Sequence, residues 1–111
     1  MNKVNRISLI GLTMLALLPL SGFAAYPIEV KKQLNGAEIA YFTQDLDRDL
    51  GALTLQNLGQ TPAICTAVFR NGPEAPRTRK TLIEPGQTRN LTVKFSRSVI
   101  KLRIQLTCVL K

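Results

Sequence analysis

The chain has 111 residues, a formal net charge of +8, no His and no Trp. Because histidine is the most common general base and the most common metal ligand, this composition argues against acid–base and metal-dependent catalysis. The length and the excess of basic residues instead favour a single small domain that meets negatively charged partners.

The first 24 residues have the layout of a secretory signal peptide. A basic start is followed by an apolar stretch over residues 7–20 and by small residues that end at Ala24, where we predict cleavage. The apolar stretch is shorter than the about 20 residues that a membrane-spanning helix needs, which argues against an uncleaved anchor. We therefore predict export to the periplasm, or secretion, of one domain spanning residues 25–111, with no transmembrane segment after cleavage.

The exported part is predicted to consist of short strands. Short runs with the residue pattern of strands cover residues 26–32, 37–43, 51–56, 63–70, 79–83, 89–95 and 99–108. Most alternate between apolar and polar residues, whereas residues 63–70 are apolar on both faces, which predicts a central strand. The second run is the least regular, because residues 37–40 also suit a helix. In the last run the apolar row predicted to face inward comprises Ile100, Leu102, Ile104, Leu106 and Cys108.

Turn residues separate these runs. Asn35 and Gly36 favour a tight turn after the first run. Residues 44–49 are predicted to form an acidic loop. Pro85 followed by Gly86 meets the requirement of a type II turn. About seven short strands with such spacing predict an immunoglobulin-like β-sandwich, with a small closed β-barrel as the alternative.

Two cysteines, Cys65 and Cys108, lie in the predicted domain. An even number of cysteines in an exported protein predicts a disulfide between them, with two buried thiols as the alternative. The bond would link the central strand to the last one, and we expect it to join the two sheets.

No residue pattern predicts catalysis, a metal site or a cofactor. Paired cysteines serve neither as nucleophiles nor as zinc ligands, and there is no glycine-rich phosphate loop. Ser96 and Ser98 lie near Lys94 and Lys101 in the sequence, and a Ser–Lys pair is chemically able to act as a nucleophile with its base. A surface turn of small polar residues explains the two serines better. The alternating carboxylates of residues 45–49 resemble the start of a calcium loop, but Arg48 interrupts them. We expect a protein that is not an enzyme.

The charge is concentrated in the C-terminal half. Residues 25–69 carry three basic and five acidic residues, whereas residues 70–103 carry nine and two, for a balance of +7. The candidate anion-binding residues are Arg70, Arg77, Arg79, Lys80, Lys94, Lys101 and Arg103. Strand alternation points the last three outward, and we expect adjacent strands to bring them onto one surface.

The alternative is that these charges only keep exposed strands from pairing. No aromatic residues are interleaved with the charges, which argues against nucleic acid as the partner.

Three segments, residues 33–36, 65–77 and 98–108, resemble a family of small exported proteins of Gram-negative bacteria. Some members of that family are labelled 3-phosphoglycerate kinase. The residues do not support this label, because that enzyme is a large cytoplasmic α/β protein with two domains. The resemblance implies a periplasmic location but carries over no functional residue. The turn over residues 84–87 also resembles hairpins of periplasmic pilus chaperones.

Three functions follow, in decreasing order of support from the sequence. The first is a non-enzymatic periplasmic module that contacts an anionic envelope component or an acidic protein through its basic half. The second is a structural or chaperone-like module that adds a strand of a partner to its sheet. The third is a hydrolase. The identity of the partner, the strand order and the oligomeric state are left open by the sequence.

Overall fold

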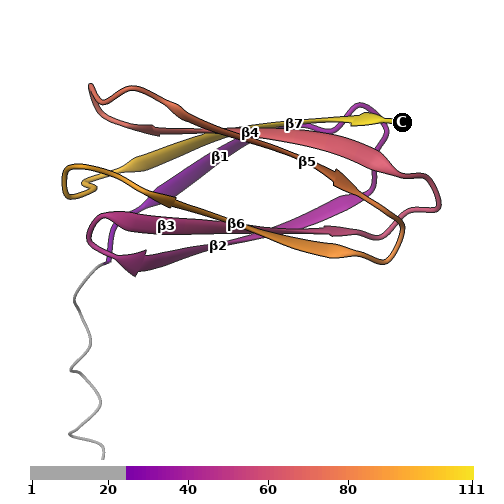
Figure 1. Cartoon of the computed structure of the whole chain (residues 1–111), viewed down its shortest axis with the longest axis horizontal. Helices are drawn as coiled ribbons and strands as arrows, with labels where there is room; N and C mark the ends of the chain where they lie inside the picture. The colour runs from indigo at the N-terminus through magenta and orange to yellow at the C-terminus, as the bar shows by residue number, and fades with distance from the viewer. Residues whose placement is uncertain (1–24) are drawn as a thin grey trace, which may run out of the picture.

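The computed structural model describes residues 25–111, and the predicted leader lies outside the described residues. The described chain forms seven strands and no helix (Figure 1). The strands are β1 (Ile28–Gln33), β2 (Ile39–Asp47), β3 (Leu50–Asn57), β4 (Ala63–Asn71), β5 (Arg77–Ile83), β6 (Thr88–Lys94) and β7 (Leu102–Leu110). Within residues 25–111 there is no helix of the length and apolar character that crossing a membrane requires.

The strands form two sheets. One has the order β1-β7-β4-β5 and the other has the order β2-β3-β6. Figure 1 shows the sheets as two facing layers, so the predicted β-sandwich is confirmed and the closed barrel is excluded.

The pairing of strands resembles that of an immunoglobulin-like sandwich with two differences: β5 pairs with β4 instead of β6, and another strand takes the place of strand G. The pair β3–β6 corresponds to strands B and E of that fold, and β4–β7 corresponds to C and F. Strand G of that fold lies beside strand F, at the edge of its sheet. Its place beside β7 is taken by β1, which runs parallel to β7 and comes from the start of the domain.

The core lies between the inner faces of the two sheets. Its largest fully buried apolar side chains are Phe69, Leu53, Leu55, Ile83, Leu102, Ile104 and Leu106. The inward row predicted for the last strand is thus confirmed from Leu102 onward, but the prediction for Ile100 is wrong, since this side chain is 85% exposed. Val99 enters the core instead, and its N–H donates to the carbonyl oxygen of Arg48 at 2.7 Å.

The predicted disulfide is present between Cys65 and Cys108, which are both fully buried. The two residues face each other in the β4–β7 ladder. The expectation that the bond joins the two sheets is therefore wrong. Neighbouring strands of one sheet place both side chains on its inner face, at the same level.

The hairpin of β2 and β3 corrects the predicted acidic loop. Strand β2 continues to Asp47, and only Arg48 and Asp49 form the turn. The carboxylates can belong to the strand because β2 is an edge strand whose end is exposed to solvent, where they stay hydrated. A register shift between Asp45 and Asp47 marks an irregularity in this ladder. Residues 37–40 form no helix.

Both predicted tight turns are confirmed. Asn35 and Gly36 have φ angles of 49° and 89°, and the N–H of Ala37 donates to the carbonyl oxygen of Leu34 at 2.9 Å. In the other turn Gly86 has a φ of 81°, as the third position of a type II turn requires.

Candidate anion-binding surfaces

The fold divides the predicted basic residues between two surfaces. Arg70 and Arg103 face outward from the four-stranded sheet, and Lys101 lies directly before β7. The remaining candidates lie on β5 and β6. The expectation that Lys94 shares a surface with Lys101 and Arg103 is wrong. Its strand, β6, belongs to the three-stranded sheet, whereas β7 belongs to the other sheet.

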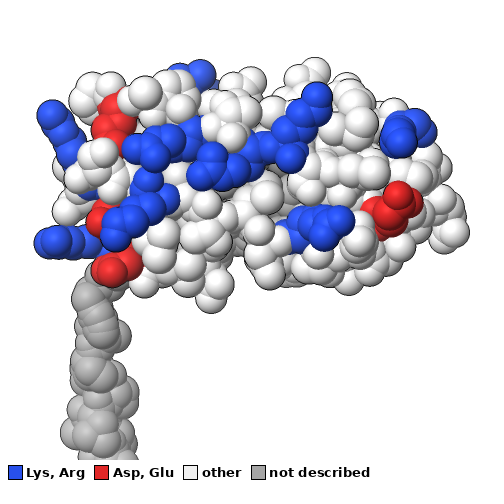
Figure 2. All heavy atoms as spheres, in the orientation of Figure 1, with Lys and Arg blue, Asp and Glu red and all other residues white. Residues whose placement is uncertain are grey.

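The first surface, here called the basic band, runs along the adjoining edges of the two sheets. It consists of Arg77, Arg79 and Lys80 on β5 and of Arg89 and Lys94 on β6. Strands β5 and β6 are edge strands of different sheets and lie next to each other. Figure 2 shows blue side chains gathered in a band across this face. The band is thus built by two edges that the sequence separates by a turn.

Strand alternation explains how the arginines reach this edge. In the β4–β5 ladder Arg79 is opposite the fully buried Ala67, so it belongs to the inner face of its sheet. In the β3–β6 ladder Arg89 is likewise opposite the fully buried Leu55. Both arginines are exposed because they lie at the open side of the sandwich. Arg89 was not among the predicted residues. It is in phase with the inward Leu91 and Val93, so alternation alone does not mark it as exposed.

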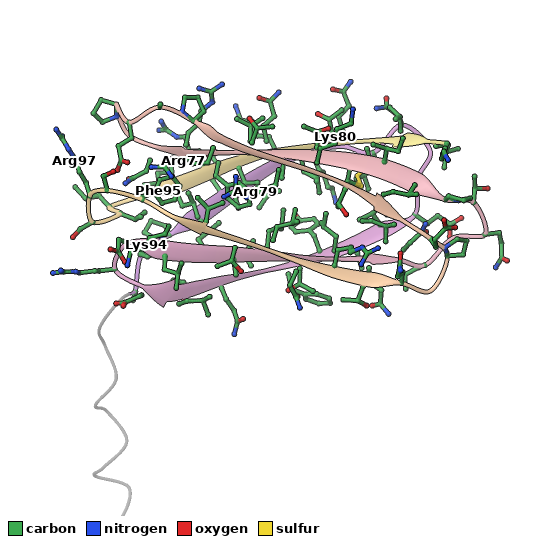
Figure 3. The ribbon with its side chains drawn as sticks, viewed as in Figure 1. Arg77, Arg79, Lys80, Lys94, Phe95 and Arg97 are labelled. Carbon is green, nitrogen blue, oxygen red and sulfur yellow. A yellow bond between two sulfur atoms is a disulfide. The ribbon has the colours of Figure 1, made fainter. Side chains whose placement is uncertain are left out.

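Arg77 is held in place from three sides (Figure 3). Its guanidinium lies 3.6 Å from the carboxylate of Glu74, donates to the carbonyl oxygen of Lys94 at 3.0 Å and lies 5.6 Å from the ring centre of Phe95. Only 35% of its side chain is exposed. Because its charge is already paired with an acid and an aromatic ring, Arg77 is less available to a binding partner than the other cations of the band.

Glu74 joins two loops at this end of the molecule. Its carboxylate accepts hydrogen bonds from the backbone N–H groups of Ser96 and Arg97, both at 3.0 Å, and from Asn71 Nδ2 at 2.8 Å. The pKa of Glu74 is lowered, chiefly by the hydrogen bond from Ser96, although desolvation opposes the shift. The carboxylate therefore stays ionised and ties the β4–β5 loop to the β6–β7 loop.

The other cations of the band are more available. Arg79, Lys80 and Arg89 are exposed and form no ion pair within residues 25–111. Lys94 pairs with Asp49 at 3.8 Å but is 73% exposed. The band therefore presents a largely uncompensated positive charge to solvent.

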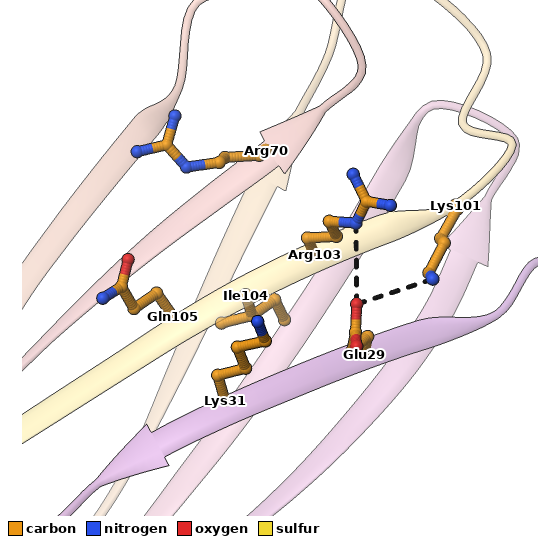
Figure 4. Close-up of a pocket in the computed structure, with 7 residues that line it drawn as sticks. All are labelled: Glu29, Lys31, Arg70, Lys101, Arg103, Ile104 and Gln105. Carbon is orange, nitrogen blue, oxygen red and sulfur yellow. Dashed lines mark ion pairs between the residues drawn. The ribbon is translucent and has the colours of Figure 1, made fainter.

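The second surface, here called the basic groove, lies on the outer face of the four-stranded sheet (Figure 4). It encloses about 410 Å³ and is lined by Lys31, Arg70, Lys101 and Arg103 together with Glu29. Strands β1, β7 and β4 supply or precede these residues. The contribution of β1 was missed, because its parallel pairing with the last strand leaves no local mark in the sequence.

Neither surface has the make-up of a metal centre. Within the described part of the chain no group of three or more Cys, Asp or Glu side chains is placed to hold a metal ion. Both cysteines are in the disulfide. What the two surfaces share is hydrogen-bond donors with positive charge, which are suited to binding anions.

Comparison with protein-family models, with curated proteins and with solved structures finds no match for this chain.

Proposed function

We propose that this protein is a non-enzymatic, exported binding module that attaches to an extended anionic surface of the bacterial envelope through its basic band. The observation that supports this proposal is the set of three exposed cations, Arg79, Lys80 and Arg89, without an acidic partner in the described chain. A concentrated positive field attracts polyanions and anionic membranes.

The shape of the band favours an extended partner over a single small ion. Residues of one strand rise about 3.3 Å each, so Arg77 and Arg79 are spaced by roughly 7 Å along the strand. A membrane of anionic lipids or a charged polymer presents many charges at such intervals. One small anion reaches only one or two of these cations at a time.

The test compares two triple variants of equal charge. The variant with Arg79→Ala, Lys80→Ala and Arg89→Ala removes the three cations of the band that form no ion pair within the described residues, and leaves Arg77, Lys94 and Glu74 intact. Lys32→Ala with Arg48→Ala and Lys111→Ala removes the same charge from exposed positions elsewhere. Because each basic residue near an anionic surface contributes about 1 kcal/mol, the band variant should bind vesicles containing phosphatidylglycerol at least about tenfold more weakly.

The control variant should change this affinity by less than about threefold, since Lys32 lies on β1, Arg48 in the β2–β3 turn and Lys111 after β7, and none of them belongs to the band. Vesicle binding should also weaken steeply as salt is raised, because salt screens exposed charges. If both triple variants lose affinity equally, the band is no specific surface and the proposal fails.

A second candidate function, strand addition, is favoured by the edge strand β2. Its outer edge is unpaired within the described residues, and Phe42 and Leu46 are 60% and 46% exposed. Long edge strands with exposed apolar side chains accept partner strands. Partner binding that persists at high salt and is lost in Phe42→Lys, but not in the sheet-face control Val109→Lys, would support this function instead.

A further inference from the structure

The basic groove has a row of charges that is unusual for a sheet surface. Arg103 on β7 is directly opposite Glu29 on β1 and directly opposite Arg70 on β4. Like charges directly opposite each other on neighbouring strands destabilise a sheet. Only one side of this row carries an opposite charge, so the Arg70 side lacks an anion.

Glu29 compensates only part of the groove. One of its carboxylate oxygens lies 3.5 Å from Lys101 Nζ and 3.5 Å from Arg103 Nε. Arg70 and Lys31 are exposed and form no ion pair within residues 25–111. Four cations therefore line the groove against one carboxylate, which leaves an excess of three positive charges.

The donors of Arg103 leave room for a second anion, and the exposed Arg70, whose guanidinium points away from Arg103 in Figure 4, can turn toward it. Figure 4 shows that Glu29 approaches Arg103 at Nε, while the two terminal nitrogens of the guanidinium are directed away from Glu29. Those nitrogens remain free to form the paired hydrogen bonds with which arginine binds phosphate. The groove volume of about 410 Å³ leaves room for such a group and for its nearest substituent.

We propose that the basic groove is a binding site for a compact dianion of the phosphate monoester class, separate from the basic band. Arg103 and Arg70 hold the phosphate from neighbouring strands, and Lys101 and Lys31 flank it. A dianion removes two of the three excess charges and relieves the repulsion between the arginines. A phosphate monoester carries nearly two charges at neutral pH, whereas a simple carboxylate carries one.

In this site Glu29 acts as an internal counter-ion. It shares Lys101 and Arg103 with the ligand, so it weakens the attraction that the groove exerts on a second anion. Removing its charge should tighten phosphate binding, and removing a charge from a distant acidic residue should not. Glu84, which lies in the exposed turn between β5 and β6, provides the matched control.

The experiment is an NMR titration of the ¹⁵N-labelled protein with inorganic phosphate at a pH of about 7.5, with chloride added to keep the ionic strength constant. We expect saturable shifts of the Arg70, Arg103 and Gln105 amide signals. Arg103→Gln should weaken binding at least about tenfold, because charge-assisted paired hydrogen bonds are lost. Glu29→Gln should tighten it about threefold, and Glu84→Gln should leave it unchanged.

Two further probes separate the sources of the phosphate group. Phenyl phosphate represents a soluble ester, and vesicles containing phosphatidic acid represent a lipid headgroup. Shifts of the groove signals by phenyl phosphate alone would assign a soluble ligand, and shifts by both probes would assign the shared headgroup chemistry. Both results support the proposal.

The proposal is overturned if phosphate causes no saturable shift, or if the shifts persist unchanged in Arg103→Gln. The variant with Arg79→Ala, Lys80→Ala and Arg89→Ala should still bind inorganic phosphate in the groove. Loss of vesicle binding in that variant, with intact phosphate binding, would show that the two surfaces act separately. Failure of one proposal therefore leaves the other standing.

Discussion

At the scale of single residues, Asn57 at the end of β3 connects three parts of the molecule. Its side chain is 1% exposed, and Nδ2 donates to the carbonyl oxygens of Thr61 and Ile83, both at 2.9 Å. Its Oδ1 accepts the N–H of Gly59 at 2.9 Å. All three hydrogen bonds of this buried amide are made, and removing it takes a partner from the buried carbonyl oxygen of Ile83 and from two partly buried groups.

We therefore predict that Asn57→Ala lowers the free energy of unfolding by about 3 kcal/mol, because buried polar groups lose their partners. Urea denaturation measures this change. The matched control is Asn90→Ala, which removes an exposed amide that accepts a hydrogen bond from Thr54. The control should cost less than about 1 kcal/mol. Equal effects of the two substitutions would contradict the structural role assigned to Asn57.

At the scale of elements, Glu74 makes the contact between the two loops pH-dependent. The pKa of Glu74 is lowered in the folded chain, first by the hydrogen bond from Ser96. A carboxyl whose pKa is lower in the folded than in the unfolded state stabilises the fold above the unfolded value. This contribution is lost as the pH falls below 4.5, the ordinary value, and through the folded value.

The corresponding prediction concerns the melting temperature at neutral and at acidic pH. Glu74→Gln should lower it at pH 7, where the ionised carboxylate is lost, and the difference from the wild type should shrink toward pH 3. Thermal unfolding followed by circular dichroism provides the measurement. Parallel pH curves for the two proteins would show that Glu74 does not couple the loops through its charge.

At the scale of the whole molecule, stability depends on a small core and one covalent link. The disulfide closes a sequence separation of 43 residues. In the chain-entropy model, closing a loop of this size in the unfolded state stabilises the fold by about 4 kcal/mol. That is a large share of the net stability typical of a small domain.

We accordingly predict that the double variant Cys65→Ala with Cys108→Ala loses about 4 kcal/mol of unfolding free energy. Reduced wild-type protein should show a similar loss, which separates the effect of the covalent bond from that of the two substitutions. Denaturant unfolding with and without reductant gives both values. A loss of less than about 1 kcal/mol would mean that the bond adds little to this fold.

How far the sequence predicts this molecule depends on the range of the interactions involved. Patterns within a few neighbouring residues are enough to predict local structure. They predicted the strand at residues 63–70, the turn at Gly86 and the inward row from Leu102 to Cys108. Ile100, which was predicted to begin that row, is exposed because the loop before β7 places Val99 in the core instead. The leader over residues 1–24 stays a prediction.

The sequence by itself determined the class of fold, the disulfide and the excess of positive charge, because these depend on composition and on local periodicity. Only the tertiary structure decided which sheet each strand joins. It therefore decided that Arg89 joins Arg79, that Lys94 is separated from Arg103 and that Glu29 meets Arg103. Alternation sets the side of a strand on which a side chain lies. Its neighbours come from pairing between strands that are far apart in the chain.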